Sequence, residues 1–176
     1  MKRLYFIRHG ESVANAKELF AGRWDTPLTK LGRDQAKEAA QAVKSLEIDC
    51  IVSSPLIRAR KTAEIIADEI GYPKNKILFS DLFMERDYGD LQAKPFKAAD
   101  KIDFEKVPNI EPQFDVIKRA KEAASYLNRL QANNVLVIGH GTHGRALHQE
   151  VLNLVPAQIE VPIQQEIPNA KVVRWI

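Results

Sequence analysis

The chain contains 176 residues, of which 45% are apolar and 28% are charged. This length suits one domain that buries roughly 70% of its unfolded surface, and the apolar fraction excludes an intrinsically disordered protein. The net charge of +3 comes from interspersed residues of both signs, which argues against nucleic acid as a partner. The single cysteine, Cys50, excludes an internal disulfide framework and a multi-cysteine metal site.

The sequence contains no apolar run approaching the ~18 residues that span a membrane. Between the charged residues Arg3 and Arg8 only residues 4–7 are apolar, too few for the core of a signal peptide. We therefore expect a cytoplasmic protein with one domain over residues 1–176 and no membrane partner. The sequence does not distinguish a monomer from a dimer.

Five short apolar runs predict β-strands. Four of them, at residues 4–7, 50–52, 77–79 and 135–138, are continuous rather than alternating, as in strands buried on both faces of a parallel sheet. The fifth, at residues 172–176, alternates once and predicts an edge strand.

Helical patterns lie between these strands. In residues 29–46, apolar side chains from Leu31 to Leu46 recur at a spacing of three or four, and further helices are predicted near residues 116–130 and 142–152. Strands that alternate with helices predict an α/β fold.

The helix predicted at residues 55–70 has the clearest start signal. Ser54 is expected to be its N-cap, and Pro55 suits the first helical position. By contrast, residues 86–113 are irregular and predict a long surface excursion that resembles a lid.

Residues with reactive side chains follow each predicted strand of the parallel sheet. Ligands of such sheets bind beyond the carboxyl ends of the strands, so we expect these residues to meet at one edge. They are Arg8 and His9 after the first strand, Arg58 after the second, Glu85 after the third and His140 after the fourth.

This set suits phosphoryl transfer through a histidine. A neutral imidazole is a nucleophile at pH 7 without a separate base, and arginine forks bind phosphoryl oxygens. A second histidine can donate to another oxygen, and a carboxylic acid can protonate the departing alkoxide, a contribution of ~10²- to 10⁴-fold. The positive end of the helix near Pro55 would also face the phosphate, and no metal or cofactor is needed.

Each of these residues has a purely structural explanation when taken alone. His9 or His140 could be a surface or satisfied histidine, Arg58 a solvated charge and Glu85 a loop carboxylate. Their coincidence at consecutive strand ends favours function.

Several motifs carry a resemblance to a known family. They are residues 4–12, which contain Arg8-His9-Gly10, then Asn15, residues 22–29, residues 53–59, residues 137–141 and, more weakly, residues 167–170. In this order, and over nearly the whole chain, they resemble the histidine phosphatase superfamily, the phosphoglycerate mutase-like proteins.

The resemblance implies a three-layer α/β/α sandwich with a mostly parallel central sheet. By position, it implies that His9 is the phosphorylated nucleophile and Glu85 the general acid. It places Arg8, Arg58 and His140 in the phosphate pocket, with Asn15 at its rim. We expect Gly141, in the motif of the second histidine, to contact the substrate, and Arg23, Trp24 and Tyr88 to shape the leaving-group pocket.

The sequence indicates the branch of the family less directly than the family itself. Residues 85–92 resemble the acid-bearing loop of the mutases, but those enzymes next carry a lysine and an arginine pair that hold the rest of the substrate. Here Phe96 falls near the position of the lysine, Lys97 lies beside it, and no arginine occurs between Arg86 and Arg119. Because a mutase must bind its second group strongly and exclude water, we expect a phosphomonoesterase that acts on a small phosphorylated metabolite. A cofactor-dependent phosphoglycerate mutase is the alternative.

Two other classes of function are weighed. Gly139-x-Gly141-x-x-Gly144 follows a strand as a dinucleotide-binding fingerprint does, but Pro156 and Pro162 interrupt the elements that should come next. A binding module for a phosphorylated ligand could use the same pocket, although binding alone would not require the acid Glu85. No metal site is predicted, because no acidic or cysteine ligand accompanies the histidines at a usual spacing.

Overall fold

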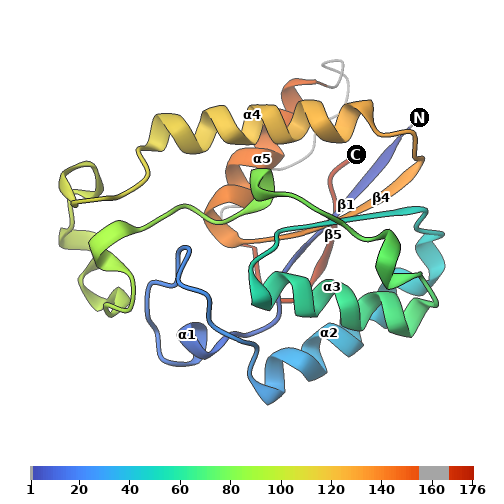
Figure 1. Cartoon of the computed structure of the whole chain (residues 1–176), viewed down its shortest axis with the longest axis horizontal. Coiled ribbons are helices and arrows are strands. Elements are labelled where there is room, and N and C mark those ends of the chain that lie inside the picture. The colour runs from blue at the N-terminus through green and yellow to red at the C-terminus, as the bar shows by residue number, and fades with distance from the viewer. Residues whose placement is uncertain (1, 155–166) are drawn as a thin grey trace.

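The computed structural model describes residues 2–154 and 167–176. Its centre is a five-stranded sheet of order β3-β2-β4-β1-β5 (Figure 1). The strands are β1 (Arg3–Arg8), β2 (Cys50–Ser53), β3 (Leu78–Phe79), β4 (Asn134–Gly139) and β5 (Val172–Arg174). The first four in the chain are mutually parallel and β5 runs antiparallel to β1, so the sheet is mixed but mostly parallel.

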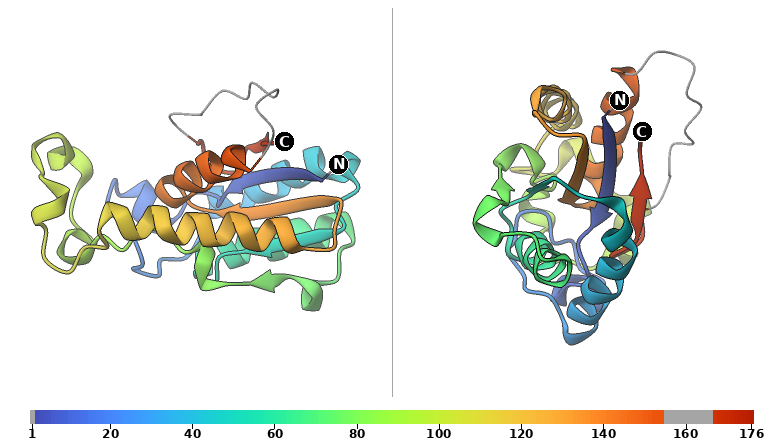
Figure 2. Two further views of the ribbon diagram at one scale, coloured as in Figure 1. Left: turned by 90° about the horizontal axis from the view of Figure 1, so that it is seen from above. Right: turned by 90° about the vertical axis from the view of Figure 1, so that its right-hand side faces the viewer.

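Helices cover both faces of the sheet (Figure 2). They are α2 (Lys30–Val43), α3 (Ile57–Ile70), α4 (Gln113–Arg129) and α5 (Gly141–Asn153), whereas the short helix α1 (Val13–Ala16) follows β1 and covers neither face. The helices α2 and α3 pack together on one face, and α4 and α5 pack together on the other. The predicted α/β fold with a mostly parallel sheet is confirmed. Within the described residues, no helix combines the length and the apolarity needed to cross a bilayer.

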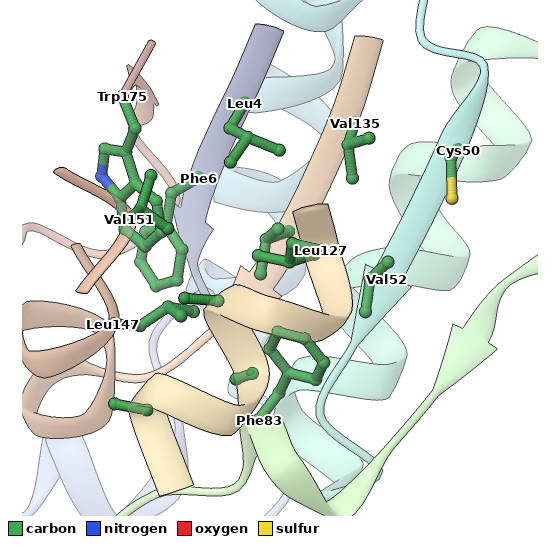
Figure 3. Close-up of a cluster of buried hydrophobic side chains, with 14 of the residues drawn as sticks. Leu4, Phe6, Cys50, Val52, Phe83, Leu127, Val135, Leu147, Val151 and Trp175 are labelled. Atoms are coloured by element: carbon green, nitrogen blue, oxygen red, sulfur yellow. The ribbon is translucent and has the colours of Figure 1, made fainter. Parts of the chain in front are cut away.

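The continuous apolar runs are explained by burial on both sides of the sheet. Along β1, Leu4 and Phe6 belong to the core beneath α4 and α5, where Phe6 stacks on Trp175 at 4.4 Å between ring centroids (Figure 3). Tyr5 and Ile7 belong to the core beneath α2 and α3. Since successive side chains of a strand point to opposite faces, a strand with helices on both sides needs apolar residues at every position.

Two predictions about burial are wrong. Leu78 and Phe79 of β3 are each 37% exposed, because β3 is an edge strand rather than an inner one. The guanidinium of Arg60 covers the Phe79 ring at 4.5 Å from its centroid. Leu31, at the start of α2, is 53% exposed and lies outside the apolar stripe of that helix.

The start of α3 also differs from the prediction. The helix begins at Ile57 rather than Pro55, and Ser54 is not its N-cap. The Ile57 N–H instead donates to Oδ1 of Asp25 at 2.7 Å. A carboxylate from a distant loop therefore satisfies the positive end of α3, the end that we expected to face the phosphate.

Residues 86–113 lie beyond the carboxyl ends of the strands, at the opposite end of the molecule from both termini (Figures 1 and 2). They contain short 3-10 helices at Gly89–Leu91, Phe96–Lys101 and Phe104–Lys106. Hydrogen bonds and ion pairs of Arg86, which is buried, and of Arg119 hold this excursion in place. Arg86 donates to Glu105 Oε1 at 3.0 Å and to the carbonyl of Glu111 at 2.8 Å, and the Glu111 carboxylate pairs with Arg119 at 2.9 Å.

Candidate active site

The carboxyl ends of the inner strands bring the predicted residues together. Arg8 is the last residue of β1 and His9 follows it, while His140 lies between β4 and α5. Arg58 is in the first turn of α3, and Glu85 comes from the segment after β3. Four of these residues line one cavity of about 190 Å³, and the ring of His140 lies 5.1 Å from that of His9 between centroids.

The imidazole of His9 is held in one tautomer. Its Nδ1 lies 2.6 Å from the carbonyl oxygen of Gly10, and because a carbonyl only accepts, Nδ1 carries the proton. Its Nε2 accepts a hydrogen bond from Arg58 Nε at 3.1 Å. Burial, followed by the charges of Arg58 and Arg8, lowers the pKa of His9 well below its usual value. At pH 7 the ring is therefore neutral, with its Nε2 lone pair directed at the cationic side of the cavity.

Arg58 is buried and is positioned by backbone carbonyls. Its Nη2 donates to Gly22 O at 2.6 Å and its Nη1 to Trp24 O at 3.2 Å. Burial lowers its pKa to about 10, so the guanidinium stays charged at pH 7. Gly22 has a φ of +53° and no room for a side chain, since a Cβ there would lie 2.9 Å from Tyr88 N. The motif at residues 22–29 thus contributes backbone oxygens that orient Arg58.

His140 pairs with Ser54, the residue that we predicted to be the N-cap of the helix after β2. Its Nε2 lies 2.8 Å from Ser54 Oγ, and Ser54 Oγ also accepts from the Leu56 N–H at 3.3 Å. If the hydroxyl donates to Nε2, the Nδ1–H of His140 is the one group of this pair that lacks a partner among the described residues. The opposite arrangement would leave both the hydroxyl proton and Nδ1 unsatisfied. The network therefore assigns the proton to Nδ1, and burial lowers the pKa of His140 well below its usual value.

Glu85 is nearly buried, and three backbone N–H groups fix its orientation. Its Oε1 accepts from Arg86 N and His143 N, both at 2.8 Å, and its Oε2 from Thr142 N at 3.0 Å. Two of these donors belong to the first turn of α5, so Glu85 caps that helix from a distant segment. One carboxylate is thereby tied to the helix that follows His140.

The remaining residues predicted for the phosphate pocket lie around the cavity. Arg8 lines it and donates from Nη1 to the carbonyl of Ile167 at 3.0 Å. Asn15 also lines it, and its Oδ1 accepts from the backbone N–H of Ser12 as part of the cap of α1. Asn169 donates to the carbonyl of His9 at 2.7 Å, which ties the weak C-terminal motif to the segment that follows β1.

The other residues predicted to contact the substrate have different positions. Tyr88 and Gly141 line the cavity, and burial raises the pKa of Tyr88 to about 12. Arg23 instead pairs with Glu111 at 3.3 Å. Trp24 is 39% exposed, and its backbone carbonyl rather than its indole contacts Arg58.

Sequence reasoning missed two cavity residues with polar side chains, Thr142 and Arg145, both on α5. Thr142 Oγ1 lies 2.7 Å from the Tyr88 hydroxyl and accepts from Arg145 Nη2 at 3.3 Å. The available signal was their position in the first two turns of a helix that begins at a strand end. Phe96, noted for its place in the sequence, also lines the cavity.

The glycines at the end of β4 and in α5 have a packing explanation. A Cβ on Gly144 would lie 2.7 Å from the Phe6 ring, so the close contact between α5 and β1 favours glycine there. A Cβ on Gly139, the last residue of β4, would lie 3.0 Å from the same ring. Pro156 and Pro162, used against the dinucleotide fingerprint, lie outside the described residues. Within the described part of the chain, no three His, Cys, Asp or Glu side chains are grouped so that they could hold a metal.

Comparisons with known proteins point to one family. Residues 4–175 match the family model of the histidine phosphatase superfamily (branch 1). A Bacillus subtilis (strain 168) protein described as the uncharacterized phosphatase PhoE is 35% identical over 153 residues, covering 86% of this chain and 78% of its own. A 2,3-bisphosphoglycerate-dependent phosphoglycerate mutase of Brucella melitensis is 34% identical over 183 residues, covering 94% of this chain and 87% of its own. A solved structure of a mycobacterial glucosyl-3-phosphoglycerate phosphatase has a TM-score of 0.73 at 26% identity, covering 88% of this chain and 81% of that one.

Proposed function

Because the chain belongs to branch 1 of the histidine phosphatase superfamily, we propose that it is a metal-independent phosphomonoesterase that forms a phosphohistidine at His9. One observation carries the proposal. The Nε2 lone pair of a buried, neutral His9 lies 3.1 Å from Arg58 Nε, in a cavity that Arg8 and Glu85 also line. A cationic cavity with a neutral nucleophile and a carboxyl group suits a phosphate monoester, which brings negative charge and needs a proton for its leaving group.

In the first half of the reaction, His9 Nε2 attacks phosphorus and the bond from phosphorus to the leaving oxygen breaks. The Nε–H of Arg58, which donates to His9 in the free protein, turns to a phosphoryl oxygen. Arg8 and the Nδ1–H of His140 compensate the charge that spreads over the other oxygens. Protonated Glu85 transfers its proton to the leaving oxygen, so the alcohol departs neutral.

In the second half, water attacks the phosphohistidine. The Glu85 carboxylate takes a proton from that water, the bond between nitrogen and phosphorus breaks, and the electron pair returns to His9 Nε2. Inorganic phosphate leaves, and Glu85 is again protonated for the next cycle.

The position of the cations supports water as the acceptor. Arg119 donates to the Glu111 carboxylate and to the carbonyls of Leu82 and Met84, so its guanidinium is occupied by the protein itself. Phe96 lines the cavity near the place where the mutases are expected to carry a lysine. The identity to the Brucella enzyme keeps phosphoglycerate mutase as the second candidate.

The proposal is tested by trapping the intermediate. After a rapid acid-free quench of enzyme with a ³²P-labelled phosphomonoester, we expect a labelled protein whose label is stable in alkali and lost in acid. The label should be absent from His9→Ala and retained in His148→Ala, a control for a buried histidine that instead stacks on Trp175.

Three outcomes would contradict the proposal. A label that survives acid, or that persists in His9→Ala, would remove His9 as the nucleophile. Binding of phosphomonoesters without release of phosphate would indicate a binding module. Interconversion of 3- and 2-phosphoglycerate at a rate comparable with hydrolysis would identify a mutase.

A further inference from the structure

A second cavity, of about 520 Å³, adjoins the cavity of about 190 Å³ that Arg8, His9, Arg58 and Glu85 line, which we call the phosphate cavity. The two share Tyr88, Thr142 and Arg145, and the second one is bounded by the 86–113 excursion, α4 and α5. We call it the side chamber. The hydrogen bond between the hydroxyl groups of Tyr88 and Thr142 joins the excursion to α5 at the boundary between the two cavities.

The two cavities differ in size, and each size suits a different part of a substrate. Sites for small-molecule ligands usually measure about 300–1,000 Å³. The phosphate cavity, at about 190 Å³, falls below this range and suits a phosphoryl group, whereas the side chamber, at about 520 Å³, lies within it. A substrate with its phosphorus near His9 would therefore extend past Arg145 into the side chamber.

The charges around the side chamber do not favour an anionic occupant. Arg86 lines it, but its guanidinium donates to the Glu105 carboxylate, the Gln113 amide and the Glu111 carbonyl. The side chain of Glu150 lines the chamber as well. Its one other cation, Arg145, lies on the wall shared with the phosphate cavity, where a phosphate ester would hold it.

The remaining lining combines an apolar wall with amide groups. Phe104 and Ile117 supply apolar surface, and the ring of Phe104 is held by Phe20 at 6.0 Å and by the guanidinium of Arg86 at 5.9 Å. Gln113 and Gln149 supply amide donors and acceptors. Such a lining binds a neutral group that has one apolar face and several hydrogen-bonding groups.

We propose that the side chamber is the leaving-group subsite, and that the preferred substrates are phosphomonoesters of a bulky, uncharged alcohol of sugar or nucleoside type rather than of glycerate. This inference rests on the proposed phosphatase function. In such a complex Arg145 lies beside the ester oxygen, and Glu150 disfavours a leaving group that carries a carboxylate.

The experiment compares kcat/KM for four esters: glucose 6-phosphate, adenosine 5′-monophosphate, glycerol 3-phosphate and 3-phosphoglycerate. We expect the sugar or the nucleotide ester to exceed glycerol 3-phosphate by about tenfold or more, and 3-phosphoglycerate to be the poorest. The first two esters distinguish a sugar from a nucleoside as the occupant.

Two variants address the side chamber directly. Ile117→Trp should lower kcat/KM for the better bulky ester about tenfold and change that for glycerol 3-phosphate less than about twofold. Its matched control is Phe114→Trp, since Phe114 is on the same helix, 73% exposed and not part of the chamber lining. Glu150→Lys should raise kcat/KM for 3-phosphoglycerate about fivefold relative to glycerol 3-phosphate, and Glu122→Lys, which alters the net charge equally, should not.

The outcomes separate this inference from the function on which it rests. Hydrolysis of glycerol 3-phosphate equal to or faster than that of both bulky esters would overturn the inference and leave the phosphatase intact. Equal losses on small and bulky esters in Ile117→Trp, or no change in selectivity in Glu150→Lys, would do the same. Wild-type protein that releases phosphate from none of the four esters would remove both.

Discussion

The contact between Ser54 and His140 leads to a prediction for a residue outside the cavity lining. In Ser54→Ala the hydroxyl that donates to His140 Nε2 over 2.8 Å is lost. The Nε2 of His140 is then left without its hydrogen-bond partner, and the ring proton is free to move from Nδ1 to Nε2. In that tautomer Nδ1 presents a lone pair to a phosphoryl oxygen, which is repulsive instead of attractive.

The expected loss follows from the cost of one missing donor. Removal of a single oxyanion donor typically lowers kcat by about 10²–10³-fold. Since the productive tautomer can still form in a fraction of the molecules, we expect kcat to fall by about 10- to 100-fold, a rise of about 1.4–2.7 kcal/mol in the activation free energy. Stability should fall by about 1–3 kcal/mol, the cost of a buried unsatisfied polar group.

Ser53→Ala is the matched control, because Ser53 is equally buried but its hydroxyl donates to the Ser54 carbonyl at 2.9 Å. Both variants should lose similar stability in urea unfolding, and only Ser54→Ala should lose the stated activity. Nitrogen chemical shifts of His140 should show Nδ1 protonated in the wild type and a shift toward Nε2 in Ser54→Ala. Activity of Ser54→Ala within about twofold of Ser53→Ala, or an unchanged tautomer, would refute this reasoning.

Three further predictions concern the acid, metals and pH. Glu85→Gln should slow the hydrolysis of alkyl phosphates about 10²–10⁴-fold and that of p-nitrophenyl phosphate much less, because only the poorer leaving group needs the proton. Equal losses of kcat on the two kinds of ester in steady-state assays would exclude the acid role. Hydrolysis should be unchanged after dialysis against EDTA, and an activity restored only by added divalent metal would contradict the metal-independent mechanism. Burial lowers the pKa of His143 to about 3, below the unfolded-state value of about 6.5. As the pH falls between these two values, the unfolded chain binds a proton at this residue and the folded protein does not. The free energy of unfolding therefore drops by up to ~1.4 kcal/mol per pH unit in this range. Urea unfolding of His143→Gln should therefore show a shallower fall from pH 6 to pH 4.5, and identical slopes would disprove this contribution.

Much of this molecule could be predicted from local pattern. The apolar runs at β1 and β4 are continuous because helices cover both faces of the sheet, and that regularity is visible without coordinates. The strand-end residues could also be found, because the carboxyl ends of parallel strands share one edge. His9, Arg58 and Glu85 meet at that edge although they are far apart in the chain.

Other features required the tertiary structure. The edge position of β3 depends on the strand order, which periodicity does not encode. Asp25 rather than Ser54 satisfies the first turn of α3, and Ser54 is thereby available to His140. Glu85 caps α5 from a segment more than 50 residues away.

The sequence by itself determined most of the helices and strands, the covering of both faces of the sheet by helices, and the set of reactive side chains. Each of these follows from the spacing of residues along the chain. The tertiary structure alone decided the tautomers of His9 and His140, the place of Arg145 and the side chamber next to the phosphate cavity. The physical reason is that a hydrogen-bond partner or a cavity wall depends on which distant segments pack together. Spacing along the chain carries no information about that choice.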